Sequence, residues 1–256
     1  GMNAFSDVSW DDPARPYMMF GPLVTPQDIS NGIAGTGLDH YSELEIASLK
    51  SLATFMTGFL TRPHSQLGRN GSVCPFTPGS LQRSLMSITA SRLDVVDVQS
   101  LLDAMDVLRD VFVEKRSEDD QDEIYRSISV VFPHLPLGEG AQLIERVQKA
   151  LKSSYIAEGL MIGEFYPGCP APGLHNAAFR PLQAPEVCLS IRHMTAFDAP
   201  FMLDDDQHLS LFVSRYDAEG KRMARRAVAK RGCPHTSARL EAIIAARGEN
   251  ADAQVR

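Results

Sequence analysis

The sequence predicts an α+β fold in which a mixed sheet of about four strands is covered mainly on one face by helices, in a sandwich related to the ferredoxin-like group. Four short segments rich in β-branched and apolar residues are read as strands, and they lie at 85–88, 125–132, 160–166 and 187–194. Helical patterns separate the first three of these segments, so parallel neighbours are allowed. The last two strands are joined by a long loop, which predicts a strand–helix–strand–helix–strand–strand–helix order.

The helices are predicted from capping residues and from apolar residues that recur every three or four positions. A capping-box pattern at Ser42 predicts a helix over residues 43–60. Asp94 is placed to cap the second long helix. Two further helices are expected over 140–155 and after the acidic run 204–206, whose charges suit the positive end of a helix dipole.

Composition shifts divide the chain into three parts. Proline and glycine are concentrated in residues 2–40, so we expect an irregular N-terminal arm that lies over the surface rather than in the core. Residues 41–220 carry the predicted sheet as a single α+β domain. Residues 221–256 form a basic helical C-terminal extension, which Gly-Cys-Pro at 232–234 divides in two. A docked surface helix is the expected reading, and a phosphate, nucleic-acid or acidic-partner contact is the alternative.

Composition and charge exclude several classes of function. The 256 residues are 44% hydrophobic and 22% charged, which is an ordinary globular composition. No apolar run approaches the length of about 18 residues that a membrane span needs, so we expect a soluble protein with no membrane partner. The net charge of −7 makes a nucleic-acid partner unlikely. Four cysteines without a CxxC pair, and a start without a signal-peptide pattern, predict free thiols and a cytoplasmic location.

Two loops hold most of the residues suited to chemistry, and they lie at 64–80 and 166–185. The strands on either side of the second loop are expected to pair, so its two ends meet. Both loops border strands of one sheet and share the same residue types, and we therefore expect them to border one pocket. Arg and Asn suit carboxylate or phosphate recognition, while His, Tyr and Cys suit proton transfer or nucleophilic attack. The candidates for catalysis are His175, Cys74 and Tyr166, and those for ligand binding are Arg69, Asn176, Arg180, Arg192 and His193.

Three of these candidates have a specific physical argument. Arg180 lies between Phe179 and Pro181, so we expect it to be the main anion anchor; the alternative is that it braces the loop by bonding carbonyls or a carboxylate. Arg192 and His193 are adjacent in a predicted strand, so they point to opposite faces and cannot both enter one pocket.

Cofactor motifs are weak or absent. The spacing of cysteines and histidines predicts no preformed metal site, and the three Cys-Pro dipeptides are only a weak indication of haem. The patterns for ATP and nicotinamide binding do not occur, so the cofactor is left unknown. His134 follows a predicted strand at the place where α/β ligands usually bind, although a surface histidine is the more common outcome.

Several motifs together resemble a domain family of unknown function from bacteria and fungi, over about residues 65 to 215. They are Val73-Cys74-Pro75-Phe76, Gly-Leu-Met-Ile-Gly-Glu-Phe-Tyr-Pro at 159–167, His175-Asn176, Phe179-Arg180-Pro181 and Ile191-Arg192-His193-Met194. A second bacterial family with a Cys-Pro-Phe start is a more remote match. Tyr166 stands where the family pattern has His, so a role that needs an imidazole there is in doubt. The resemblance implies one pocket shared by the two loops and names no reaction.

The leading hypothesis is therefore a protein that binds a small anionic molecule between the two loops through Arg69, Asn176 and Arg180. Either it acts on this molecule with His175 or Cys74, or it only recognises it, so whether it is an enzyme is left open. The alternative is a non-catalytic ligand-binding or protein-interaction module, and a haem- or metal-binding protein is less favoured. The oligomeric state is unknown.

Overall fold

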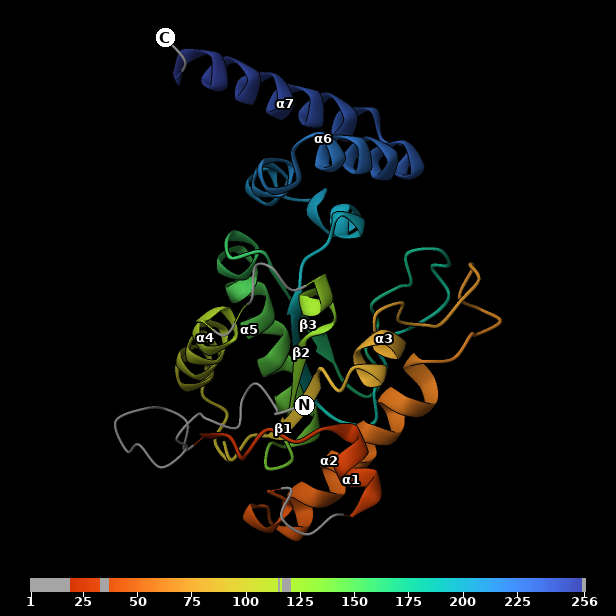
Figure 1. Cartoon of the computed structure of the whole chain (residues 1–256), viewed down its shortest axis with the longest axis vertical. Helices are drawn as coiled ribbons and strands as arrows, with labels where there is room; N and C mark the ends of the chain where they lie inside the picture. The colour runs from red at the N-terminus through yellow and green to blue at the C-terminus, as the bar shows by residue number, and fades with distance from the viewer. Residues whose placement is uncertain (1–18, 33–36, 115, 117–120, 255–256) are drawn as a thin grey trace. The chain divides into compact units, whose positions relative to one another are not determined.

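The computed structural model describes residues 19–32, 37–114, 116 and 121–254 (Figure 1). These residues form two compact units. Unit 1 comprises the described residues up to Lys152 together with Met161–His193, and unit 2 comprises Ser153–Leu160 and the residues from Met194 onward. In the described part of the chain, no helix is both long and apolar enough to cross a membrane.

A four-stranded mixed sheet is the centre of the fold, and it confirms the predicted α+β class. The strands have the order β1-β2-β4-β3. β1 and β2 are parallel with Ala90 opposite Val131, and β2 and β4 are antiparallel with Val131 opposite Cys188. The relation to the ferredoxin-like group stays a prediction. The strands are β1 (Met86–Ala90), β2 (Ser127–Val131), β3 (Leu160–Phe165) and β4 (Cys188–His193).

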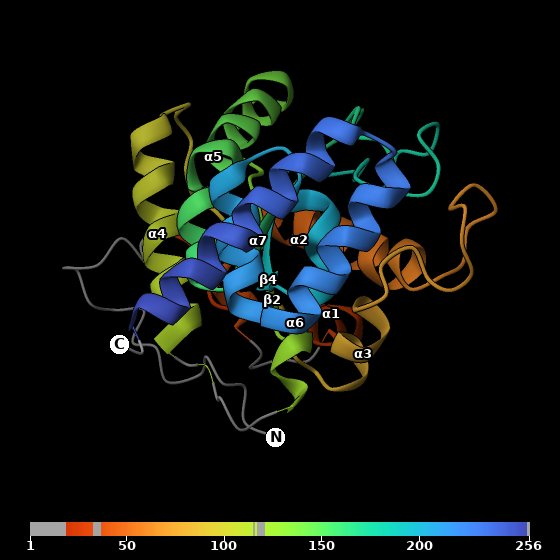
Figure 2. The ribbon, with the colours of Figure 1, turned by 90° about the horizontal axis from the view of Figure 1, so that it is seen from above.

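Helices lie on both sides of this sheet, where the sequence predicted them mainly on one (Figures 1 and 2). The reason is that all five residues of β1 are buried, so both of its faces need a cover. On one side lie α4 (Val98–Glu114) and α5 (Leu137–Ala157); on the other lie α1 (Pro26–Asn31), α2 (Glu43–Phe55) and α3 (Thr77–Gln82).

Residues 19–32 correct part of the expected N-terminal arm. They enter the core instead of lying over it, because Phe20 and Val24 form antiparallel bridges to Ser91 and Ile88 along the edge of β1. Val24 and Ile29 are 0% and 5% exposed. Residues 2–18 and 33–36 of the predicted arm lie outside the described residues.

The helix predicted over 43–60 is present in two parts. Ser42 and Glu45 form the predicted capping box: Ser42 Oγ accepts from Glu45 N at 3.3 Å, and Glu45 Oε2 accepts from Ser42 N at 2.8 Å. After α2, residues Met56–Leu60 form a π-helical turn. Such a turn is uncommon and contains one more residue than an α-helical turn.

The next long helix begins later than predicted. Asp97, not Asp94, caps α4, because its Oδ2 accepts from Ser100 N at 3.0 Å and its Oδ1 accepts from Gln99 N at 3.3 Å. Asp94 is exposed. α5 covers the helix predicted over 140–155.

Unit 2 is helical and contains η5 (Ala196–Met202), α6 (Asp206–Arg231) and α7 (Pro234–Gln254). The acidic run 204–206 begins α6 as predicted, with Asp205 as its cap. The predicted boundary at residue 221 falls inside α6, four residues after a non-helical backbone at Asp217. The predicted division into an arm, a domain and an extension stays a prediction.

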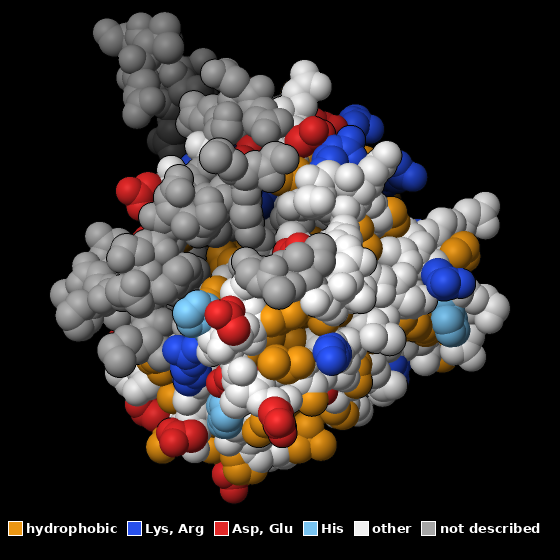
Figure 3. All heavy atoms as spheres, turned by 60° about the horizontal axis from the view of Figure 1, so that its bottom comes forward, with side chains coloured by type: hydrophobic (Ala, Val, Ile, Leu, Met, Phe, Trp, Pro, Cys, Tyr) orange, Lys and Arg blue, Asp and Glu red, His pale blue; other side chains and the backbone are white. Residues whose placement is uncertain are grey.

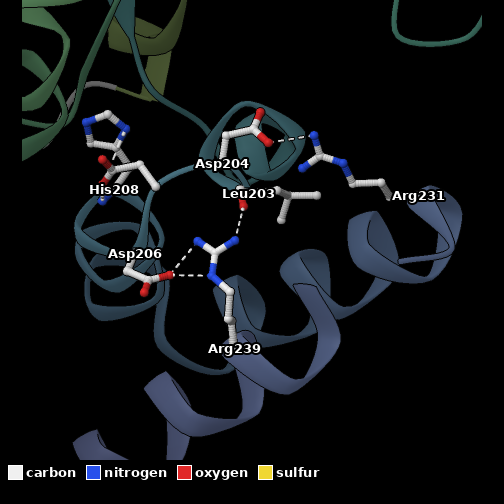
Figure 4. Close-up of polar contacts among 7 residues, drawn as sticks. Leu203, Asp204, Asp206, His208, Arg231 and Arg239 are labelled. Carbon is white, nitrogen blue, oxygen red and sulfur yellow. Dashed lines mark hydrogen bonds and ion pairs between the residues drawn. The ribbon is translucent and has the colours of Figure 1, made fainter. Parts of the chain in front are cut away.

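The basic residues of the C-terminal segment pair with acids of the same unit. Arg231 lies 2.6 Å from Asp204 Oδ1, and Arg239 donates to Asp206 Oδ1 through Nε at 2.8 Å (Figure 4). Arg239 also donates to the carbonyl of Leu203 at 3.4 Å. These contacts hold α6 and α7 to residues 203–206 of the same unit, and the role of the basic extension stays a prediction.

Candidate functional site

The two loops of interest lie against each other in unit 1. Asn176 Nδ2 donates to the carbonyl of Gln66 at 2.8 Å. Gly68 lies so close to the second loop that a Cβ at this position would be 2.8 Å from the carbonyl oxygen of His175. The side chain of His175 is exposed. The loops therefore approach each other through Gln66–Gly68 and His175–Asn176.

The arginines of these loops bind their own backbone. Arg69 donates to the carbonyls of Asn70 at 2.9 Å and Val73 at 3.0 Å. Arg180 donates to the carbonyl of Phe179 at 3.2 Å and to that of Ala177. Arg180 therefore makes the bracing contacts that were the alternative to an anion anchor.

A shallow hollow of about 620 Å³ opens on the first loop. Arg69 is the cationic side chain in its described lining. His64 Nδ1 accepts from Gln66 N at 3.1 Å, so the neutral imidazole has its proton on Nε2 and is a donor there. Among the residues described around the hollow there is no carboxylate, so its polar side chains are suited to an anion. It is lined by Pro63, His64, Ser65, Gly68, Arg69, Asn70 and Gly71.

A second, mainly apolar groove of about 580 Å³ lies at the far end of a row of aromatic rings that begins at His64 in the hollow. His64 stacks on Phe179 with ring centroids 4.7 Å apart, and Phe179 lies 6.4 Å from Phe59. Phe59 stacks in turn on Phe55 at 5.2 Å. We call these four rings the aromatic ladder. The groove is lined by Lys50, Ser51, Thr54, Phe55, Gly58, Phe59 and Pro185.

Cys74 lies at the foot of the first loop. Its backbone N–H donates to the carbonyl of Leu60 at 2.9 Å, and its half-buried side chain packs against the hydrophobic cluster that includes Phe179. The side chain thus has the packing of a small hydrophobe.

Tyr166 lies under the second loop, next to α5. Its hydroxyl donates to Glu145 Oε2 at 3.3 Å, and burial raises the pKa of Tyr166, so the hydroxyl stays protonated at neutral pH. Burial also raises the pKa of Glu164, whereas the hydrogen bond from Lys149 lowers the pKa of Glu145. Two carboxylates with opposite pKa shifts are a feature of acid–base sites, and also of structural ion pairs.

Arg192 and His193 point to opposite faces of the sheet, as predicted. The Arg192 guanidinium lies 5.0 Å from the centre of the Phe76 ring. His193 is 7% exposed, and its Nε2 lies 3.0 Å from Glu123 Oε2. Arg126, which is 2% exposed, donates to the same carboxylate oxygen through Nε at 2.9 Å. His193 therefore belongs to a buried charged group beside α4 and not to the two loops.

A second histidine–carboxylate pair lies where β2 ends. His134 Nε2 is 2.9 Å from Glu45 Oε1, and the side chains are 27% and 5% exposed. Burial raises the pKa of Glu45, but hydrogen bonds from His134 and Ser42 outweigh this effect, and the net pKa lies below its usual value. The sequence indicated His134 but not Glu45, because a Glu in a capping box normally lies in solvent.

In unit 2, the side chain of His208 lies between those of Ser153 and Asp205. Ser153 Oγ lies 2.8 Å from His208 Nε2, while His208 Nδ1 is 3.8 Å from Asp205 Oδ1, which is too long for a hydrogen bond. The Ser153 contact links the end of α5 to α6. In the described residues, no group of three or more His, Cys, Asp or Glu side chains could hold a metal ion.

Comparison with known proteins identifies a protein family. A family model described as "Domain of unknown function (DUF6875)" matches residues 49–227. This span contains the sheet, both loops and His134. No curated protein and no solved structure matches the chain.

Proposed function

Because this match covers more than half of the chain, the chain belongs to the DUF6875 family, and we propose that it binds a small anionic ligand in the hollow of the first loop. The observation that supports this proposal is the position of Arg69 in a hollow whose described lining contains no acid. A guanidinium in such surroundings attracts a carboxylate or a phosphate.

Both arginines bond carbonyls of their own loops, but Arg69 lines the hollow and Arg180 does not, so Arg69 replaces Arg180 as the proposed anchor. Its two hydrogen bonds to Asn70 and Val73 fix the plane of the guanidinium, and among the described residues its Nε donates to no group. The Nε2 proton of His64 and the hydroxyl of Ser65 are further donors around the hollow. A ligand would meet a preorganised cation, which reduces the entropy cost of binding.

The aromatic ladder adds a preference for ligands with an apolar part. It leads from His64 in the hollow to Phe55 in the groove, and aromatic stacking contributes about 0.5–1.5 kcal/mol for a pair. We therefore expect benzoate to bind more tightly than acetate. This is a recognition function; catalysis by His175 or Cys74 stays a prediction.

Titration of the full chain with acetate, benzoate and inorganic phosphate, followed by NMR or calorimetry, tests the proposal. Arg69→Ala is expected to weaken anion binding by about tenfold or more, because it removes a charge-assisted hydrogen bond. Arg180→Ala is the matched control, since it removes an arginine that braces the neighbouring loop, and the affinity should stay unchanged.

Two results would contradict the proposal. Saturable binding of none of the three anions would favour the alternative of a protein-interaction module. A loss of affinity in Arg180→Ala with no loss in Arg69→Ala would return the anchor to the second loop.

A further inference from the structure

The pair of Glu45 and His134 is distinct from the two-loop region and has the contacts of an oriented imidazole. Glu45 is nearly completely buried, and its two carboxylate oxygens have separate partners: Oε2 accepts from Ser42 N, and Oε1 meets His134 Nε2. The carboxylate is thus held in place by the start of α2, and it holds the histidine in turn.

This contact determines which nitrogen of His134 carries the proton. An ionised carboxylate only accepts hydrogen bonds, so His134 Nε2 is the donor, and the neutral ring has its lone pair on Nδ1. Among the described residues, Nδ1 makes no hydrogen bond. A buried carboxylate that fixes the tautomer of a partly exposed imidazole is the arrangement used by histidine bases.

The pair also lies where a ligand could bind, at the carboxyl ends of two parallel strands. β1 and β2 are parallel with Ala90 opposite Val131, so Arg92 and His134 follow the ends of two neighbouring strands. Ligands of α/β sheets commonly bind beyond the carboxyl ends of parallel strands. Figure 3 looks toward this end of unit 1 and shows histidine side chains close to acidic and basic ones around apolar surface.

Arg92 is a cation at this edge. It is exposed and donates to the carbonyl of His40 at 2.8 Å, which leaves donors of its guanidinium for another group. Tyr41, next along the chain, is not a second base, because its hydroxyl bonds Thr89 Oγ1 at 3.0 Å and burial raises the pKa of Tyr41 to about 12.

We propose that His134, positioned by Glu45, is a general base for the hydrolysis of small anionic esters that Arg92 attracts to the carboxyl ends of β1 and β2. In the reacting step, Nδ1 takes a proton from a water molecule while the water oxygen forms a bond to the ester carbonyl carbon. The bond between this carbon and the leaving oxygen then breaks, and the leaving group departs with the electron pair. The proton on Nδ1 passes to solvent, which restores the neutral imidazole.

The test compares hydrolysis of a neutral probe, 4-nitrophenyl acetate, with that of an anionic one, mono-4-nitrophenyl glutarate, using the full chain. His134→Ala is expected to lower kcat/KM for both probes by about a hundredfold, the usual contribution of a general base. Arg92→Gln is expected to raise KM for the glutarate probe alone by about tenfold, since it removes only the attraction of the charge.

Glu45→Gln tests the positioning residue. Glutamine at this place still completes a capping box, so the variant keeps the start of α2. It is expected to lower kcat by about tenfold or more with KM unchanged, because the imidazole loses its orientation while the substrate contacts remain. A merely structural role for Glu45 would change the melting temperature and leave the kcat of the folded protein as it was.

His40→Ala is the matched control. His40 lies on the same edge, and its Nε2 is 4.0 Å from Asp39 Oδ1, but the two side chains are 66% and 76% exposed. Its removal should leave both rates unchanged. The proposal fails if the wild type is no faster than free imidazole at equal concentration, if His134→Ala keeps the rate, or if His40→Ala loses as much.

Discussion

The two-loop region and the end of β2 use similar polar side chains with different partners. Arg180 bonds carbonyls one and three residues away in its own loop, whereas His134 bonds a carboxylate that is 89 residues distant in the sequence and almost completely buried. A local partner fixes the shape of a loop. A distant, buried partner such as Glu45 holds the His134 side chain in one orientation and one tautomer, as a catalytic imidazole requires.

The largest effect is expected at the contact between the loops. Gly68→Ala would place a Cβ 2.8 Å from the His175 carbonyl oxygen at a backbone φ of +77°, so the loops must separate. We expect a loss of about 2–4 kcal/mol in the free energy of unfolding, from positive-φ strain and overpacking together. Urea unfolding measures it.

Gly71→Ala is the control for that experiment. Its φ is +90°, but the nearest atom to a Cβ there is the Arg69 guanidinium at 3.5 Å, which leaves room. Only the strain remains, at about 1 kcal/mol. Equal losses in the two variants would show that the contact between the loops adds no stability.

A smaller effect is expected for Arg180. Arg180→Ala should lower the free energy of unfolding by about 1–2 kcal/mol, because two carbonyls lose a charged donor. Arg180→Lys should recover part of it, because both bonds come from the single nitrogen Nη1 and a lysine ammonium can also donate to two carbonyls. Denaturant unfolding beside acetate titration separates the two roles, and unchanged stability with weaker binding would contradict the bracing role.

Glu45 should show its effect through pH. Burial raises the pKa of Glu45, but hydrogen bonds from His134 and Ser42 outweigh this and hold it below its ordinary value. Its ionised contacts therefore stabilise the protein above the ordinary pKa and lose their effect as pH falls through the folded pKa. Glu45→Gln should therefore cost about 1 kcal/mol at pH 7 and almost nothing at strongly acidic pH. The exposed Glu43 in the same helical turn gives the control, Glu43→Gln, for which thermal unfolding should change little at either pH.

Ionisation of Glu164 should lower folding stability where ionisation of Glu45 raises it, and its effect should be the smallest of the set. Burial raises its pKa above the ordinary value, so its ionised form costs stability once pH has risen above the folded pKa. Glu164→Gln should raise the free energy of unfolding at pH 7 by less than about 1 kcal/mol, seen as a slightly higher melting temperature, and should have no effect below the ordinary pKa. A lower melting temperature at pH 7 would mean that the carboxylate is stabilised by Lys149 and Lys152.

The sheet was predictable because its signals are local. Each strand is a short apolar run, and the capping box at Ser42 needs only residues three positions apart. The cover of the second face was missed, since Val24 and Ile29 lie among prolines and glycines and are recognised only where they pack on β1. The two ends of the second loop meet because β3 and β4 are neighbours in the sheet.

The partners of the polar side chains were not predictable. Arg180 was read as an anion anchor from its stiff neighbours, but a loop carbonyl is an equally good acceptor, and no sequence pattern tells the two apart. The contact between Glu45 and His134 depends on how α2 packs beside β2, which the sequence shows for neither residue alone.

The π-helical turn at Met56–Leu60 has a consequence for chains of slightly different length. Each helical residue rotates the following one by about 100°, so one extra residue in a turn resets the rotational phase of everything after it. Deleting Thr57 would restore a regular α-helix and turn Phe59 away from Phe179 without changing any side chain of the loop. The preference for aromatic anions that we propose would then depend on one inserted backbone residue, and a relative shorter by this residue would keep Arg69 and lose that preference.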